Sequence, residues 1–122
     1  MKLMVFILNR NDVLDKLLEG FSAAGIRGAT IIESAGLAVT LSRMGSNIFS
    51  ASLKALLSAE ENNHTIISVI KDSQLEIARK VIYRTVGDLS KPNTGVLCTM
   101  PLDFVEGTIK KTSDTVEEKK EQ

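Results

Sequence analysis

The sequence contains few of the residue types that build catalytic, metal or disulfide sites. Among 122 residues there is no Trp, one Tyr, one His and one Cys. A single cysteine, Cys98, excludes an intrachain disulfide, so we expect a reducing compartment such as the cytoplasm. One histidine, His64, leaves few side chains that could act as general acid or base near neutral pH. We therefore expect neither a metal site nor enzymatic activity.

The sequence also has no excess of charge of one sign. Fifteen basic and fifteen acidic residues give a formal net charge of zero. Proteins that bind nucleic acid or an anionic membrane carry a basic patch that neutralises phosphate, and this sequence has no such stripe. Few aromatic residues are present to stack on single-stranded bases. No nucleic-acid partner is expected.

The chain also lacks long hydrophobic runs. The apolar run from Leu3 to Leu8 has six residues, whereas about 18 are needed to span a bilayer. It is also short for a signal peptide, and the polar residues 9–12 follow at once. The protein is therefore not expected to be membrane-embedded, and this run is typical of a central strand that is buried on both faces.

Apolar spacing predicts four strands and two helices. Each change between a spacing of two and a spacing of 3.6 residues coincides with turn or capping residues. Asn11 is expected to cap the first helix and Gly25 to end it, while a capping box at residues 73–76 opens the second helix and Gly87 ends it. The expected strands are 2–8, 29–33, 64–70 and 95–100, and the expected helices are 12–24 and 75–86.

This order of elements predicts an α+β, ferredoxin-like βαββαβ fold, in which two helices cover one face of an antiparallel sheet. Strands 2–8 and 64–70 are apolar on both sides. Because two helices can cover only one face, the other face needs a partner. A second copy of the chain is the simplest partner, so we expect a closed homo-oligomer.

One stretch, residues 34–63, is too long for an ordinary connection in a compact domain, and such loops are usually functional. A short helix is expected at about residues 51–59. We expect a domain at 1–109 and a charged, disordered tail at 110–122. The apolar residues of the loop predict a surface that docks a partner protein, or else packs on the protein's own oligomer; they include Ile48, Phe49 and Leu53.

Residues 24–36, AGIRGATIIESAG, resemble the segment that joins the first helix to the second strand in PII nitrogen-regulatory signalling proteins. The other strands and the Gly-containing turn before the fourth strand follow PII order over residues 2–109. The resemblance implies a homotrimer of ferredoxin-like subunits. It also implies that a nucleotide binds between subunits and that the long loop docks onto a target transporter or enzyme.

The resemblance also indicates ligand-binding residues. Thr30, Gly36 and Val69 match positions that line the nucleotide site of the family. The turn 88–95 is expected to cradle an anion through backbone N–H groups, with an ordinary surface turn as the alternative. The residues of this turn that we assign to the ligand are Lys91, Thr94 and Gly95.

Two phosphate-binding features of the PII family have no counterpart here. Val96 stands where the family has a lysine, and residues 103–109 contain no arginine. ATP and ADP are therefore candidate ligands without matched phosphate contacts. Arg10 is a further candidate anion ligand, with an ordinary surface arginine as the alternative.

Together, these features predict a PII-like signal-transduction protein, a trimeric small-molecule sensor that regulates a partner protein, with nitrogen regulation implied by the resemblance. A CutA-like trimeric structural or metal-associated protein is the alternative. That class shares the architecture but needs metal ligands that this chain hardly offers.

Overall fold

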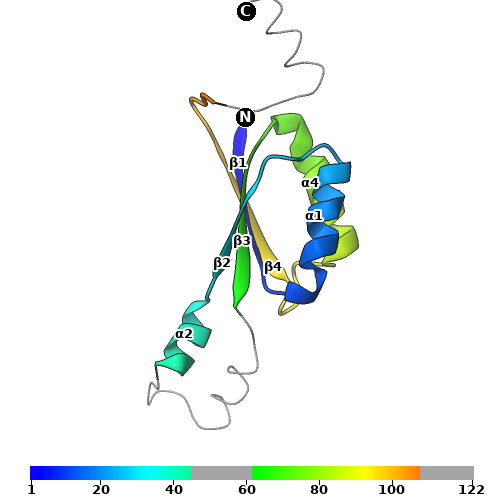
Figure 1. Ribbon diagram of the computed structural model, residues 1–122. Coiled ribbons are helices and arrows are strands. Elements are labelled where there is room, and N and C mark those ends of the chain that lie inside the picture. The colour runs from blue at the N-terminus through cyan, green and yellow to red at the C-terminus, as the bar shows by residue number, and fades with distance from the viewer. Residues whose placement is uncertain (45–61, 108–122) are drawn as a thin grey trace, which may run out of the picture.

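The computed structural model describes residues 1–44 and 62–107, and its elements follow the predicted order. Figure 1 shows their arrangement. The strands are β1 (Lys2–Leu8), β2 (Thr30–Ser34), β3 (Asn63–Ile70) and β4 (Gly95–Pro101). The α-helices are α1 (Leu14–Ala23), α2 (Leu37–Arg43) and α4 (Leu75–Thr85), and the 3-10 turns η1 (Asn11–Val13) and η2 (Asp72–Gln74) lead into α1 and α4.

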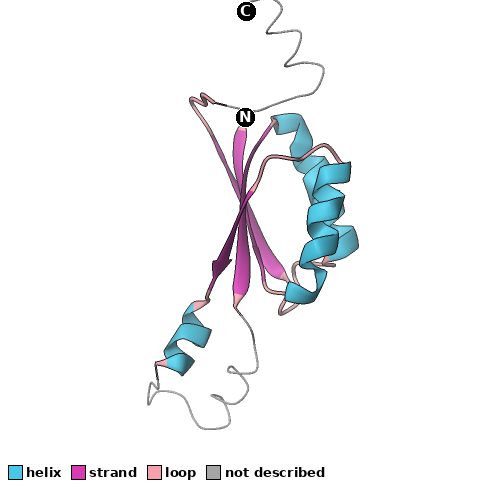
Figure 2. Ribbon diagram, viewed as in Figure 1, coloured by secondary structure: helices cyan, strands magenta, loops and turns pink. Residues whose placement is uncertain are grey.

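The four strands form one antiparallel sheet in the order β2-β3-β1-β4. Helices α1 and α4 pack side by side on one face of it (Figure 2). Strand β1 is central and is paired along its whole length, since Lys2 pairs with Ile70 and Pro101, and Leu8 with His64 and Gly95. The ferredoxin-like βαββαβ fold predicted from the sequence is confirmed.

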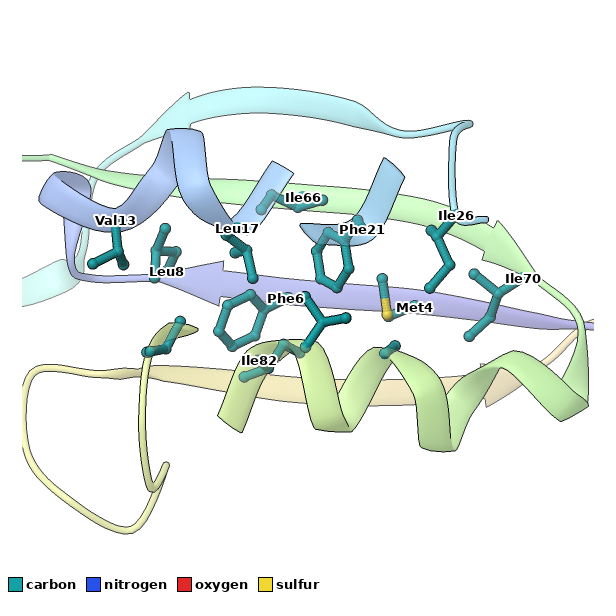
Figure 3. Close-up of a cluster of buried hydrophobic side chains, with 13 residues drawn as sticks. Met4, Phe6, Leu8, Val13, Leu17, Phe21, Ile26, Ile66, Ile70 and Ile82 are labelled. Atoms are coloured by element: carbon teal, nitrogen blue, oxygen red, sulfur yellow. The ribbon is translucent and has the colours of Figure 1, made fainter. Parts of the chain in front are cut away.

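The core lies between the sheet and the two helices (Figure 3). Met4, Phe6 and Leu8 alternate along β1 and are fully buried. Leu17 and Phe21 of α1 pack on them from above in this view, and α4 covers the same sheet face from below. Burying each such side chain stabilises the fold by roughly 1.5–3 kcal/mol, so these three residues of β1 form the centre of the core.

Both helix ends follow the sequence prediction. Gly25 and Gly87 adopt left-handed conformations with φ of 91° and 102°, which a glycine after a helix adopts without steric cost. The N–H of Gly87 donates to the carbonyl of Tyr83 at 3.1 Å. These glycines therefore end α1 and α4 as expected.

Both predicted helix caps were wrong, although the second helix begins at Leu75 as expected. Asn11 does not cap the first helix, because its side chain donates to the Asn62 carbonyl, which is distant in sequence. The second helix is preceded by a reciprocal pair two residues earlier than expected, in which Gln74 Oε1 accepts the Lys71 N–H (2.8 Å) and the Gln74 N–H donates to the Lys71 carbonyl (2.9 Å). The turn η2 therefore shifts the capping pair away from residues 73–76.

The stretch 34–63 contains a helix that the sequence did not predict. Ser34 ends β2, Asn63 begins β3, and α2 occupies part of the interval, beyond the end of the sheet (Figure 1). The helix expected at 51–59, the docking residues Ile48, Phe49 and Leu53, and the tail 110–122 lie outside the described residues. In the part of the chain that is described, no helix is long and apolar enough to cross a membrane.

Candidate ligand and self-association site

The sheet face opposite α1 and α4 carries apolar side chains from all four strands, and no described element covers it (Figure 2). Side chains alternate between the faces of a strand, so the register assigns residues to each face. Val5, for example, lies between Ile67 and Cys98. This open sheet face consists of Leu3, Val5 and Ile7 (β1), Thr65, Ile67 and Val69 (β3), Val96, Cys98 and Met100 (β4), and Thr30, Ile32 and Ser34 (β2).

The two faces of the sheet differ sharply in exposure. Val96 is 57% exposed and Met100 50% on the open sheet face, whereas Met4 and Phe6 on the helix face are 0% exposed. Large exposed apolar patches are a feature of surfaces that bind other proteins, ligands or membranes. The partner predicted for the second face of the sheet therefore has a surface on which to bind.

The residues assigned to the ligand from β2 and β3 lie at one edge of the sheet. Thr30 pairs with Ile67, so Val69 is its diagonal neighbour on the open sheet face. Gly36 follows β2, and its carbonyl accepts hydrogen bonds from the Thr40 N–H at 3.0 Å and the Thr40 hydroxyl at 2.8 Å. Gly36 therefore stands between the edge strand and the first turn of α2.

The turn 88–95 is internally hydrogen-bonded. Asp88 Oδ1 accepts the Ser90 N–H at 2.9 Å, and the Asp88 carbonyl accepts the Lys91 N–H at 3.1 Å. The backbone hydrogen bond from Ser90 lowers the pKa of the Asp88 carboxyl. Two N–H groups of the predicted anion cradle therefore already have acceptors within the turn.

Thr94 and Gly95 hold this turn against β1. The Thr94 hydroxyl is buried and donates to the Lys91 carbonyl at 2.9 Å. A Cβ on Gly95 would lie 2.5 Å from the Ile7 carbonyl oxygen and 2.9 Å from the Phe6 ring. Lys91 itself is exposed. Of the three residues assigned to the ligand in this turn, Lys91 is the one whose side chain can meet a ligand in solution.

Strand order separates the two groups of assigned residues. Thr30 and Gly36 belong to the β2 edge, whereas Lys91 and Gly95 belong to the β4 edge, with β3 and β1 in between. A single chain therefore does not bring them into one pocket. Only the edges of two different copies could do so.

The structure also shows a polar cluster that the sequence analysis did not find. His64 Nδ1 lies 2.8 Å from Asn11 Oδ1, and the Asn11 amide donates to the Asn62 carbonyl. Arg43, in the last turn of α2, donates to Asn62 Oδ1 at 2.7 Å. These bonds connect α2 and the start of β3 to the turn after β1.

A second part of the cluster lies across the sheet end. The Ser34 hydroxyl hydrogen-bonds the Asn63 side chain and lies 2.8 Å from Thr65 Oγ1, and the Asn63 amide donates to Asn9 Oδ1 at 3.3 Å. Both ends of segment 35–62 are therefore fixed to the same end of the sheet. Four asparagines beside the predicted strand ends, at 9, 11, 62 and 63, were the available signal.

Arg10, the further candidate for an anion, already has partners in the fold. Its guanidinium donates to the Val86 carbonyl at 3.3 Å and to Asp12 Oδ2 at 2.9 Å. The side-chain hydrogen bond between them raises the pKa of Arg10 and lowers that of Asp12. Arg10 therefore ties the end of β1 to the end of α4.

Two further observations concern metal binding and similarity to known proteins. Within residues 1–44 and 62–107, no group of three His, Cys, Asp or Glu side chains is arranged to hold a metal ion. No model of a known protein family matches the chain, and no curated protein matches it either. The ferredoxin-like fold is consistent with the PII-like resemblance, which rests on that fold and on the sequence motifs.

Proposed function

We propose that this protein is a PII-like regulatory protein, a homotrimer that binds a small anionic ligand between copies and thereby regulates a partner protein. The observation that carries the proposal is the division of the assigned ligand residues between the β2 and β4 edges. Burial of the open sheet face favours association of the copies, and in the proposed trimer the β2 edge of one copy lies beside the β4 edge of another.

The energetics favour self-association. Fully burying one Val, Leu or Ile side chain contributes roughly 1.5–3 kcal/mol, and association costs about 4–15 kcal/mol in lost freedom of motion. The open sheet face offers several partly exposed side chains of this kind, among them Val96, Met100 and Ile32. Covering them by other copies therefore offsets part of that cost.

The side chains at the β2 and β4 edges favour an anionic ligand that also carries other polar groups. Lys91 is the only basic residue in the turn 88–95, and Thr30 adds a hydroxyl on the open sheet face. An adenine nucleotide is the leading candidate, held through Lys91 and backbone groups because Val96 replaces the lysine of the family.

The regulatory part of the proposal rests on α2. This helix projects beyond the sheet (Figure 1), and Leu37 and Met44 at its two ends are 76% and 74% exposed. The polar cluster fixes its base to the sheet end. A partner protein that binds there would meet exposed apolar side chains directly connected to the β2 edge of the ligand site.

The test combines sedimentation equilibrium with calorimetric titration of ATP, ADP and cyclic nucleotides, with and without magnesium and 2-oxoglutarate. We expect a trimer that binds one ligand per subunit. Lys91→Glu should weaken binding, whereas Lys16→Glu, an exposed lysine on α1, should not. A strictly monomeric protein at micromolar concentration refutes self-association, and a trimer without binding heat refutes the nucleotide alone.

A further inference from the structure

The outward face of α4 is a second exposed surface, separate from the open sheet face. Ala78, Val81 and Ile82 bury the inner side of α4 against the core. The outer side points away from the sheet (Figure 1) and borders a surface hollow of about 460 Å³. The residues that line this hollow are Ile77, Arg79, Lys80, Tyr83 and Arg84.

Charge on this face is unbalanced. Arg79 donates to Glu76 at 2.8 Å, but no carboxylate among the described residues pairs with Lys80 or Arg84. Lys80 and Arg84 are one turn apart, where like charges repel and destabilise a helix. Beside them, Tyr83 is 67% exposed and Ile77 42%. The face therefore suits an acidic segment that also carries an apolar side chain.

One segment of this chain has that composition. Residues 114–118 read D-T-V-E-E, with three carboxylates around Val116. We propose that this acidic segment binds the outward face of α4 in its own chain, with its carboxylates on Lys80 and Arg84 and Val116 in the hollow.

Near the end of its described part, at Leu102, the chain passes close to the start of α4. The Leu102 N–H donates to the Met1 carbonyl at 3.1 Å, and the Met1 amino group lies 3.2 Å from Asp72, in the turn η2 that leads into α4. From Gly107, seven residues reach position 114, which spans up to about 23 Å when extended. The nine steps from Leu75 to Arg84 rise about 14 Å, so the linker is longer than the face that it has to cross.

Tethering adds to the attraction. A segment joined to its binding surface by a short linker has an effective concentration in the millimolar range, so weak ion pairs suffice to hold it. The binding is therefore expected to fall at high salt, because exposed ion pairs are screened. The surface is also independent of the proposed trimer, since it lies on the helix layer rather than on the open sheet face.

The chain provides its own probe for the test, because Tyr83 is the only tyrosine and there is no tryptophan. In the full chain, Glu117→Lys with Glu118→Lys should increase quenching of Tyr83 fluorescence by acrylamide and shift the amide resonances of residues 77–84. Lys80→Glu with Arg84→Glu should have the same effect. Combining all four reversals should restore the quenching of the unaltered protein.

Matched controls separate this contact from general charge effects. Lys119→Glu with Lys120→Glu changes the same tail but keeps its carboxylates, and Lys16→Glu changes charge on α1; neither should increase quenching. Unchanged quenching in the tail variants, or no restoration in the fourfold variant, overturns the proposal. It is also overturned if those variants are silent while a separate polyglutamate peptide shifts the α4 resonances, because the partner is then another acidic molecule.

Discussion

At Gly95 the backbone of β4 packs tightly against β1. Its missing side chain lets the Ile7 carbonyl and the Phe6 ring lie where a Cβ would stand. We assigned Gly95 to the ligand as part of the predicted anion-binding turn 88–95, and the structure adds a packing reason for glycine at this position. Both roles can hold together, because the packing uses the Cα and a ligand would meet the backbone.

Gly95→Ala should therefore destabilise the protein by about 1–3 kcal/mol, because overpacking forces the backbone of β1 or the Phe6 ring to move. The measurement is the free energy of unfolding in urea. Gly28→Ala is the matched control, since a Cβ there meets nothing within 4 Å. Equal stability of the two variants would show that the β1–β4 contact can widen without cost.

We expect the contribution of Asp88 to the stability of the fold to depend on pH. Its pKa is lowered in the fold by the backbone hydrogen bond from Ser90, so its contribution to stability is present above the unfolded pKa of about 3.9. That contribution is lost as pH falls through the lower, folded pKa. Asp88→Ala should lower the thermal midpoint at neutral pH, and its difference from the unaltered protein should shrink in acid.

Asp103→Ala, which removes an exposed carboxylate after β4, is the control for this measurement. Its thermal midpoint should follow that of the unaltered protein across the same pH range. A difference for Asp88→Ala that stays constant down to pH 2 would mean that the loss came from the side chain's packing and not from its charge.

At the level of elements, α1 and α4 touch at Gly20. A Cβ there would lie 2.8 Å from Cγ1 of Val81, and a β-branched side chain has little rotamer freedom to move away. Alanine normally favours a helix over glycine by about 1 kcal/mol. We expect the clash to outweigh this gain, so that Gly20→Ala lowers the free energy of unfolding.

A double-mutant cycle checks the cause. In the background of Val81→Ala, which removes the clashing methyl group, Gly20→Ala should cost less than it does alone or should stabilise. If the effects of the two substitutions are additive, the loss of stability in Gly20→Ala does not come from the contact with Val81.

Elements were predictable where their sequence signal is local. The strands and both core helices follow from apolar spacing, and the helix ends follow from Gly25 and Gly87. Helix α2 was missed because seven residues give too short a pattern. The Asn11 cap was wrong because a partner distant in sequence, Asn62, takes its side chain, and no local pattern shows such a contact.

At the level of the whole molecule, the open sheet face was predictable from the two-sided apolar strands. The separation of the assigned ligand residues onto two opposite edges of the sheet was not predicted. It follows from strand order, which sets Thr30 and Gly95 at opposite edges. The hydrogen bonds within the turn 88–95 could not be predicted from the sequence pattern either, because they depend on the geometry of Asp88 and Thr94.

Two neighbouring isoleucines test the open sheet face. Ile31 is 43% exposed and Ile32 44%, but they point to opposite faces of β2. Ile32→Glu should shift the oligomer toward monomer in sedimentation experiments, because a charge would be buried between copies. Ile31→Glu, equally exposed on the helix side, should leave the assembly unchanged. Loss of assembly in both variants, or in neither, contradicts the proposed interface.

The central place of β1 has a consequence for synthesis. Residues 2–8 leave the ribosome before both of their pairing partners, β3 at 63–70 and β4 at 95–101. Until those strands emerge, an apolar strand has both edges open, which invites aggregation or chaperone binding. Pairings this distant in sequence also form slowly. A chain that stops before β4 therefore leaves its most apolar strand as an unprotected edge.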